Sequence, residues 1–301
     1  MVREYPYLVA GLPQLMLDAE VKGFDIQRFK DELREGLHPD DYADLEWFFY
    51  PVDNWNLISF QLLGIKKHNF TFMPGGKFTY VQMEEGLKNP GIFPPYMEDF
   101  IQCKSRKKDP EEPEDLITRL CGDDPVKQLL YRFYGTASRS RCPLIRDWYA
   151  FEHALYNLKA ALSARRLGRP VEESILPGGP LDEALLNNKA SDFGLRGVEP
   201  WIDAYFGLLE IKNSVEREKR IDLLRWKKMD DLTEKHYIDV YLIHAFMMKA
   251  FTVVRWILLD ETSGQQMFGR LLKETRGSYN LQDAFDGKST PSEVEESENQ
   301  K

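Results

Sequence analysis

The chain has 301 residues, of which 43% are hydrophobic and 30% charged, a mixture typical of globular proteins. A net charge of −9 without a separate basic stripe argues against nucleic acid or an anionic membrane surface as the main partner. The three cysteines form no Cys-x-x-Cys pair. Their pattern argues against a disulfide framework or a zinc site and predicts a reducing, cytoplasmic environment.

The first elements of the chain combine a helix, a Pro-Gly-Gly stretch and a charged segment. Residues 29–37 carry apolar side chains at helical spacing, which predicts a short helix that ends before Pro39. Residues 70–81 have aromatic and β-branched residues around the Pro-Gly-Gly, which indicates a short hairpin. Residues 104–115, KSRKKDPEEPED, are charged and interrupted by proline, and we expect a linker or loop there.

The middle of the chain has the strongest helical pattern. Its apolar residues fall on one stripe, and burying each contributes roughly 1.5–3 kcal/mol, so we expect a central packing helix. Before it, Asp124 and Pro125 predict an N-cap and first residue of a shorter helix with Val126 facing inward. After it, Pro200 predicts the start of a long helix that continues through Val215. The stripe consists of Leu144, Trp148, Phe151, Leu155, Leu158 and Leu162.

The last apolar segment, residues 240–259, is about as long as a membrane-spanning helix. It contains Lys249 and Arg255 as well as His244, and a charge at mid-bilayer is costly. We therefore predict a helix buried in a helical bundle, and no direct membrane span. Residues 283–301 are acidic and poor in large apolar side chains, which predicts a disordered tail.

One unusual sequence pattern occurs twice. An Asn-Leu pair on a helix is followed by a glycine and then by Pro-Gly-Gly. Glycine readily adopts a positive φ and proline cannot continue a helix, so each Pro-Gly-Gly predicts a turn that ends a helical segment. Two such turns suggest an internally duplicated helical architecture. The copies are Asn56, Leu57, Gly64, Pro74, Gly75 and Gly76, and Asn157, Leu158, Gly168, Pro177, Gly178 and Gly179.

These features predict an all-α fold of repeated small helical bundles joined by Pro-Gly-Gly turns. We divide the chain into three helical units, with a charged linker or loop after the first and an acidic tail after the third. The predicted units are residues 1–103, 116–198 and 199–282, the linker is residues 104–115, and the tail is residues 283–301.

Residues 156–185, YNLKAALSARRLGRPVEESILPGGPLDEAL, resemble the C-type subunit of the A/V-type rotary ATPases, which is the d-type subunit in eukaryotes. That family has an Asn-Leu/Ile-Lys helix, a basic cluster before Leu-Gly, and an Ile-Pro-Gly-Gly-like turn. Its fold, three small helical bundles with approximate three-fold symmetry around a funnel, is implied here by the resemblance. Ser163 stands where the family commonly has an arginine. The matching residues are Asn157, Leu158, Lys159, Arg165, Arg166, Leu167, Gly168, Pro177, Gly178 and Gly179.

Three further stretches resemble an uncharacterised bacterial family associated with the subunits of V-type ATPases. They are YPYLVAGLPQL near the N-terminus, RIDLLRWKKMDDLTEKHY at 220–237, and the helix through Val254-Arg255-Trp256. The resemblances imply a non-catalytic central-stalk spacer that couples the rotating shaft to the membrane rotor ring. The implied partners are the central-shaft and rotor-ring subunits, with no cofactor. The implied location is the cytoplasm, peripheral to the inner face of the membrane through the complex.

Two acidic motifs raise an enzymatic alternative. Asp40–Asp44 matches DDxxD and Asp230–Glu234 matches DDxxE, motifs that bind Mg²⁺ and a diphosphate in all-α isoprenoid synthases. The structural interpretation, which we favour, places the first motif at a helix N-terminus and pairs the second with Lys227, Lys228 and Lys235. A helical scaffold unrelated to rotary motors is the other alternative.

The remaining motifs carry less chemistry. Gly75-Gly76-Lys77 superficially matches a phosphate loop, but Thr71 and Phe78 occupy the positions that need Gly and Ser or Thr. The five histidines are scattered, so we expect no metal site. Arg165 and Arg166 end the central helix, where they favourably meet the helix dipole. They are also the interface candidates, as a basic rim facing an acidic partner protein.

Overall fold

The computed structural model of the protein describes residues 2–17, 26–63, 72–105 and 116–259. Within these ranges the chain forms α-helices, two short 3₁₀ helices and no strand, which confirms the predicted all-α class. The elements are α1 (Pro6–Ala10), α2 (Ile26–Gly36), α3 (Pro39–Leu45), η1 (Glu46–Phe48), α4 (Tyr50–Leu63), α5 (Tyr80–Lys88), η2 (Pro90–Ile92), α6 (Pro95–Ser105), α7 (Leu116–Cys121), α8 (Pro125–Ala137), α9 (Pro143–Leu167), α10 (Asp182–Asn187), α11 (Pro200–Leu208), α12 (Ser214–Thr233) and α13 (Val240–Leu259).

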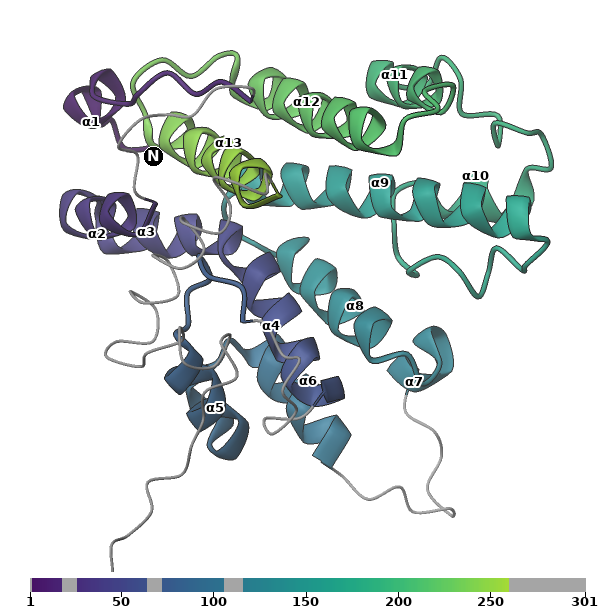
Figure 1. The fold of residues 1–301 in the computed structure, drawn as a ribbon, viewed down its shortest axis with the longest axis horizontal. Helices are drawn as coiled ribbons and strands as arrows, with labels where there is room; N and C mark the ends of the chain where they lie inside the picture. Colours follow the sequence, from purple (N-terminus) through teal and green to yellow (C-terminus); the bar gives the residue numbers. More distant parts are fainter. Residues whose placement is uncertain (1, 18–25, 64–71, 106–115, 260–301) are drawn as a thin grey trace, which may run out of the picture.

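The helices form two connected groups (Figure 1). In the upper group, α12 packs against α9, α11 and α13. In the lower group, α8 packs against α4, α6 and α7 and also contacts α9. The N-terminal segment joins the upper group, because Glu4 and Asp239 form an isolated antiparallel bridge just before α13.

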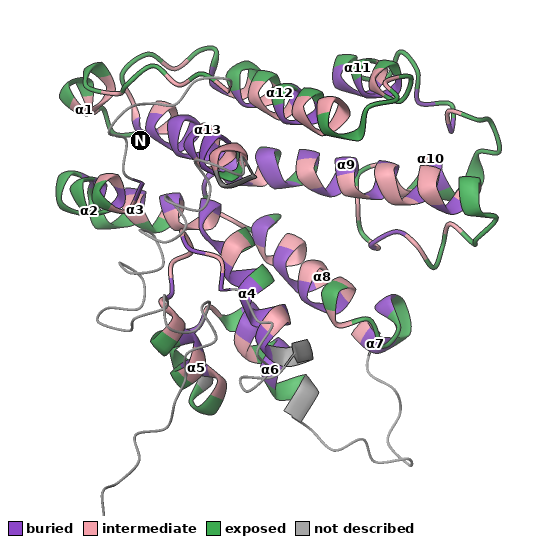
Figure 2. Cartoon of the chain, in the orientation of Figure 1, coloured by how far each residue is buried: buried purple, intermediate pink, exposed green. Residues whose placement is uncertain are grey.

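The buried apolar side chains form one cluster that extends from Ile26 to Val254 (Figure 2). This core crosses the predicted unit boundaries. For example, α6 packs on α8 across the predicted linker, and the Tyr149 hydroxyl donates to the Trp47 carbonyl at 2.6 Å. The described helices therefore share a core, while the three units and their approximate three-fold symmetry stay predictions.

The central helix α9 follows the predicted stripe. Five of the six stripe residues are buried, and Leu162 at the end is half-buried. The helix ends at Gly168, whose φ of 64° is left-handed and whose amide donates to the Arg165 carbonyl at 3.2 Å. At this position glycine avoids the steric cost that a Cβ imposes on a positive φ.

The shorter helices confirm two predicted boundaries. The Asp124 carboxylate caps α8 by accepting from the amides of Val126 and Lys127, and Pro125 is the first residue of that helix. The predicted inward orientation of Val126 is wrong, because this side chain is 38% exposed. The helix predicted over residues 29–37 is α2, and Pro39 begins the next helix, α3.

Two other predictions are corrected. The long helix expected from Pro200 through Val215 is two helices, because the Asn213 side chain accepts from the Val215 and Glu216 amides and starts α12 anew. The hairpin expected over residues 70–81 is replaced by a turn and a helix in the part described. There, Thr79 forms a reciprocal capping box and opens α5. Local capping chemistry overrides the apolar pattern in both places.

The apolar segment 240–259 forms α13. Val240–Ile257 is the one window among the described residues that is long and apolar enough to cross a membrane, and 56% of it is buried inside the protein. Its polar side chains have protein partners: Arg255 donates to Asp222 at 2.6 Å and Lys249 pairs with Asp230. These contacts fit the predicted helix of a bundle core.

Some predictions fall outside the described residues. They concern Gly64, most of the charged linker (residues 106–115), the end of the third unit (residues 260–282) and the acidic tail (residues 283–301).

Candidate functional site

The first Pro-Gly-Gly turn is clasped by an asparagine one helix away. Asn56 lies on α4 and is completely buried. Its Nδ2 donates to the Met73 carbonyl and its Oδ1 accepts from the Met73 amide, both at 2.8 Å. Pro74 follows Met73, so one side chain satisfies both backbone polar groups of the residue before the turn.

The second turn has the same clasp. Asn157 lies on α9 and is completely buried. Its Nδ2 donates to the Leu176 carbonyl at 2.7 Å, and its Oδ1 accepts from the Leu176 amide at 2.8 Å. Pro177 follows Leu176. The sequence repeat therefore encodes one structural device twice: a helical asparagine that holds the residue before Pro-Gly-Gly.

The two glycines of each turn serve different purposes. Gly75 and Gly178 have φ values of 98° and 84°, where a side chain is strained. Gly76 and Gly179 instead lie against polar side chains. A Cβ on Gly76 would be 2.1 Å from Asp53 Oδ1, and one on Gly179 would be 2.7 Å from Asn157 Nδ2. The first glycine permits the turn, and the second permits its close approach to the helix.

Charged groups surround the first turn. Asp53, one helical turn before Asn56, accepts from the Lys77 amide at 2.8 Å and from the Phe78 amide at 3.2 Å. From the other side, Lys30 Nζ donates to the Gly76 carbonyl at 2.6 Å. Burial raises the pKa of the Asp53 carboxyl, against the opposing effect of its amide donors and Lys30. Burial also lowers the pKa of Lys30, against the attraction of Asp53.

Neutral and half-buried groups surround the second turn. His153, one helical turn before Asn157, has its Nε2 3.0 Å from the Leu176 carbonyl, so this nitrogen carries the proton. Burial lowers the pKa of His153, and its ring stacks on Tyr134 at 4.7 Å. Asp182 is half-buried and accepts from the Gly179 amide at 2.9 Å and from Asn157 Nδ2 at 2.9 Å.

A cleft of about 510 Å³ opens beside the second turn. It lies between α6, α8 and α9, with Pro177 and Gly178 in its wall. Its lining is rich in tyrosine and includes His153 and two arginines, Arg132 and Arg139. The second turn thus separates a buried clasp from an open cleft.

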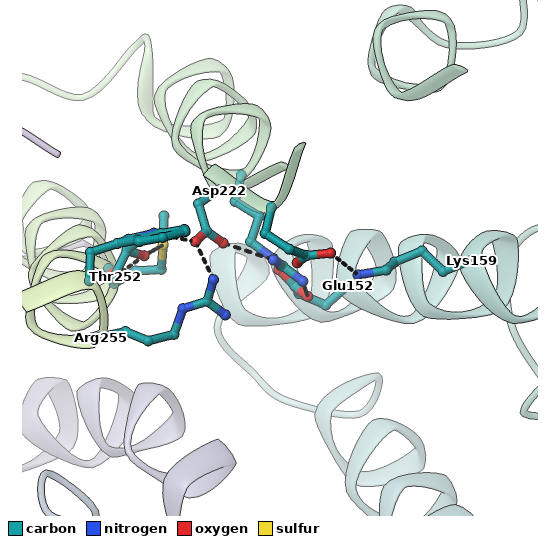
Figure 3. A network of polar contacts seen from close by, with 9 residues as sticks. Glu152, Lys159, Asp222, Thr252 and Arg255 are labelled. Atoms are coloured by element: carbon teal, nitrogen blue, oxygen red, sulfur yellow. Dashed lines mark hydrogen bonds and ion pairs between the residues drawn. The ribbon is translucent and has the colours of Figure 1, made fainter. Parts of the chain in front are cut away.

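A polar network joins the three long helices (Figure 3). Arg225 on α12 forms a two-pronged pair with Glu152 on α9 at 2.7 and 3.2 Å. Arg225 also donates to the buried Asp222 at 3.0 Å, and Asp222 accepts from Arg255 and Trp256 on α13 at 2.6 and 2.7 Å. The opposite charge of Glu152 and Asp222 keeps the pKa of Arg225 raised despite burial.

The two interface candidates at the end of α9 differ in their surroundings. Arg165 donates to the carbonyls of Asn188 and Ala190, and its guanidinium lies 3.5 Å from the centre of the Phe193 ring. It therefore fixes the loop after α10. Arg166 is exposed. A role in holding another protein stays a prediction for both, and the more accessible group is Arg166.

The acidic motifs occupy helix ends and pair with basic side chains. Asp40 and Asp41 lie in the first turn of α3, as the dipole argument predicts, and both accept from Arg3. Asp230 pairs with Lys249 and not with the lysines nearest in sequence, because α13 packs on α12. Among the described residues, no group of three or more His, Cys, Asp or Glu side chains has the arrangement of a metal site.

Sequence reasoning found both turns but missed the polar groups beneath them. Asp53 and His153 occupy corresponding places, three and four residues before the clasping asparagines. This helical spacing is a signal that points to them. Lys30 leaves no such signal, and neither do the contacts that join α12 to α9 and α13, because these partners are distant in sequence and meet only through helix packing.

Fold and turns define an all-α protein in which one asparagine-clasped Pro-Gly-Gly turn occurs twice. The chain belongs to the family DUF2764, described as a protein of unknown function, which matches residues 1–277. No curated protein matches the chain, and no solved structure matches it.

Proposed function

We propose that the protein is a non-catalytic central-stalk component of a V/A-type rotary ATPase, coupling the rotating shaft to the membrane rotor ring. The observation that carries the proposal is the clasped turn of residues 156–185, the stretch that resembles the C-type subunit of these ATPases. Within it, Asn157 holds Leu176 before Pro177, and the other copy of the turn repeats the arrangement.

A stalk component that transmits torque must resist deformation between its two docking faces. The polar network on α9, α12 and α13 supports such a role, because Asp222 and Arg225 together fix the relative positions of three long helices. A buried network of this kind selects one packing more than it adds stability. Docking to the shaft and the rotor ring would place the protein at the cytoplasmic side of the membrane, with α13 in its own core.

The test is affinity purification of the tagged full-length chain from mildly solubilised native membranes. Shaft and rotor-ring subunits are expected to co-purify in a fixed ratio. Recovery of the chain without them would contradict the proposal and would leave a helical scaffold unrelated to rotary motors. The isoprenoid alternative predicts a different result. The chain would be recovered with enzymes of prenyl diphosphate metabolism, and it would bind a prenyl diphosphate in the presence of Mg²⁺. Asp41→Ala would abolish this binding.

A charge reversal tests the basic rim. Arg166→Glu is expected to lower recovery of the partner proteins, because an exposed arginine that meets an acidic surface becomes repulsive when its charge is reversed. Arg119→Glu, the same change at an exposed position on α7, is the matched control and should leave recovery unchanged. Equal recovery with both variants would remove Arg166 from the interface.

A further inference from the structure

The cleft beside the second turn has a buried cation in its lining. Arg132 on α8 is 8% exposed. One guanidinium nitrogen donates to the Gln128 carbonyl and the other to Cys103 Sγ, each at 3.1 Å, while Nε has no partner. Arg132 has no ion pair with any carboxylate of the described residues. A buried charge that has no ion pair among the described residues is costly, so this cleft favours an anion.

The other polar groups of the cleft also favour an anionic ligand. Arg139 lies seven residues after Arg132, just beyond the end of α8, and is exposed. The hydroxyl of Tyr131 makes no hydrogen bond within the described part of the chain. One carboxylate, the exposed Asp99 on α6, also lines the cleft. The cleft therefore has two cations and one free hydroxyl donor but only one acid, which favours a ligand rich in acceptor oxygens.

The rest of the lining is aromatic and suits a flat organic body. Tyr96 and Tyr149 are buried, and their hydroxyls are already engaged by Asn54 and by the Trp47 carbonyl. The ring surface open to the cleft therefore comes from the half-buried Tyr131 and Tyr134. A volume of about 510 Å³ lies in the range of small-molecule sites and exceeds what an inorganic anion fills.

We propose that the cleft between α6, α8, α9 and the second Pro-Gly-Gly turn binds a small phosphomonoester that carries a planar ring. The two guanidinium groups match the charge of a phosphate dianion, and arginine binds phosphate oxygens in a fixed geometry. The tyrosine rings contact the planar part of the ligand. This site is additional to the stalk function and does not depend on it, because it requires no partner protein.

Titration calorimetry of the purified full-length chain tests the site. The probes are adenosine monophosphate and phenyl phosphate, with inorganic phosphate, benzoate and adenosine for comparison. Both ring-bearing phosphates are expected to bind more tightly than the other three. Arg139→Gln should weaken their binding about tenfold, the effect of one lost charge-assisted hydrogen bond. Arg169→Gln, the same change on an exposed arginine outside the cleft, should leave binding unchanged.

A second experiment tests the buried arginine and does not depend on Arg139. It measures the thermal unfolding of Arg132→Met. This variant removes the buried charge and keeps an apolar side chain, so it should fold, and adenosine monophosphate should no longer raise its unfolding temperature. Absence of binding by both ring-bearing phosphates to the wild type would overturn the proposal. So would equal weakening by Arg139→Gln and Arg169→Gln. Equal binding of inorganic phosphate and adenosine monophosphate would overturn the planar-ring part.

Discussion

The two Pro-Gly-Gly turns have the same backbone recognition but different electrostatics. In each, a buried asparagine bonds both the amide and the carbonyl of the residue before proline. Beneath the first turn lie two buried ionisable groups, Lys30 and Asp53. Beneath the second lie a neutral His153 and a half-buried Asp182. The geometry of the turn therefore depends on the asparagine and the glycines, while the neighbouring charges are free to differ.

The difference also separates the surroundings of the two turns. The first is covered by other helices: Lys30 reaches it from α2, and a Cβ on Gly75 would lie 3.1 Å from the Phe251 ring of α13. The second has open space around Gly178 and borders the cleft. The first turn is thus part of the core, and the second is accessible to a ligand in the cleft.

Loss of the clasping asparagines should have the largest effect. Leaving a buried backbone group unsatisfied costs about 1–3 kcal/mol, so losing two such bonds lowers the free energy of unfolding by about 2–6 kcal/mol. Asn157→Ala should cost more than Asn56→Ala, because Leu176 is fully buried and Met73 is partly accessible to water. Urea denaturation measures both, with the exposed Asn187→Ala as control. Losses equal to that control would refute the clasp as a stabilising device.

The carboxylates come next and should separate the two turns. Asp53→Asn keeps the shape but replaces one of the two oxygens that accept from the Lys77 and Phe78 amides, and leaving such an amide unsatisfied costs about 1–3 kcal/mol. Asp182→Asn should cost less, about 1 kcal/mol or below, because solvent screens the half-exposed carboxylate. The same denaturation assay applies. A larger loss with Asp182→Asn would reverse the proposed contrast between buried and accessible turns.

Alanine substitutions should distinguish the two glycines within each turn. Overpacking costs about 1–3 kcal/mol, and Gly76→Ala should lie at the upper end because its Cβ meets a carboxylate that two amides hold in place. Gly179→Ala should be intermediate. Gly178→Ala meets open space and should cost about 1 kcal/mol from its positive φ alone. Thermal unfolding measures the order, and a smaller loss at Gly76 than at Gly178 would contradict it.

The smallest effect concerns pH and has opposite signs at the two turns. The pKa of His153 is lowered in the folded state, so below about 6.5 the unfolded chain binds more protons and stability falls as pH falls. The slope is at most about 1.4 kcal/mol per pH unit. The pKa of Asp53 is raised in the folded state, so above about pH 3.9 the folded chain binds more protons than the unfolded chain. The contribution of Asp53 to stability therefore falls as pH rises.

Denaturation at pH 7, 6 and 5 tests these signs. His153→Gln retains a donor for the Leu176 carbonyl and should lose less stability than the wild type between pH 7 and pH 5. Part of the acid sensitivity should remain, because burial lowers the pKa of His244 to about 4. Asp53→Asn should have the opposite effect and lose more stability than the wild type between pH 7 and pH 5. Parallel pH profiles for the wild type and His153→Gln would show that the second turn does not depend on the neutral imidazole.

The sequence by itself determined the helical class, the central stripe of α9, the cap at Asp124 and the positions of both turns. These features depend on local chemistry: 3.6-residue periodicity, the capping carboxylate, and the φ preferences of proline and glycine. It mistook residues 200–215 for one helix, because the apolar pattern there conceals a second cap at Asn213.

Only the tertiary structure decided which side chains meet across helices. Lys30 reaches a turn 45 residues away, and Asp222 joins α12 to α13 across 33 residues. The Arg132 guanidinium became visible as a candidate anion site only when packing placed it in the lining of a cleft without an ion pair to any described carboxylate. Such contacts follow from helix packing, which brings distant residues together without leaving a periodic mark on the sequence.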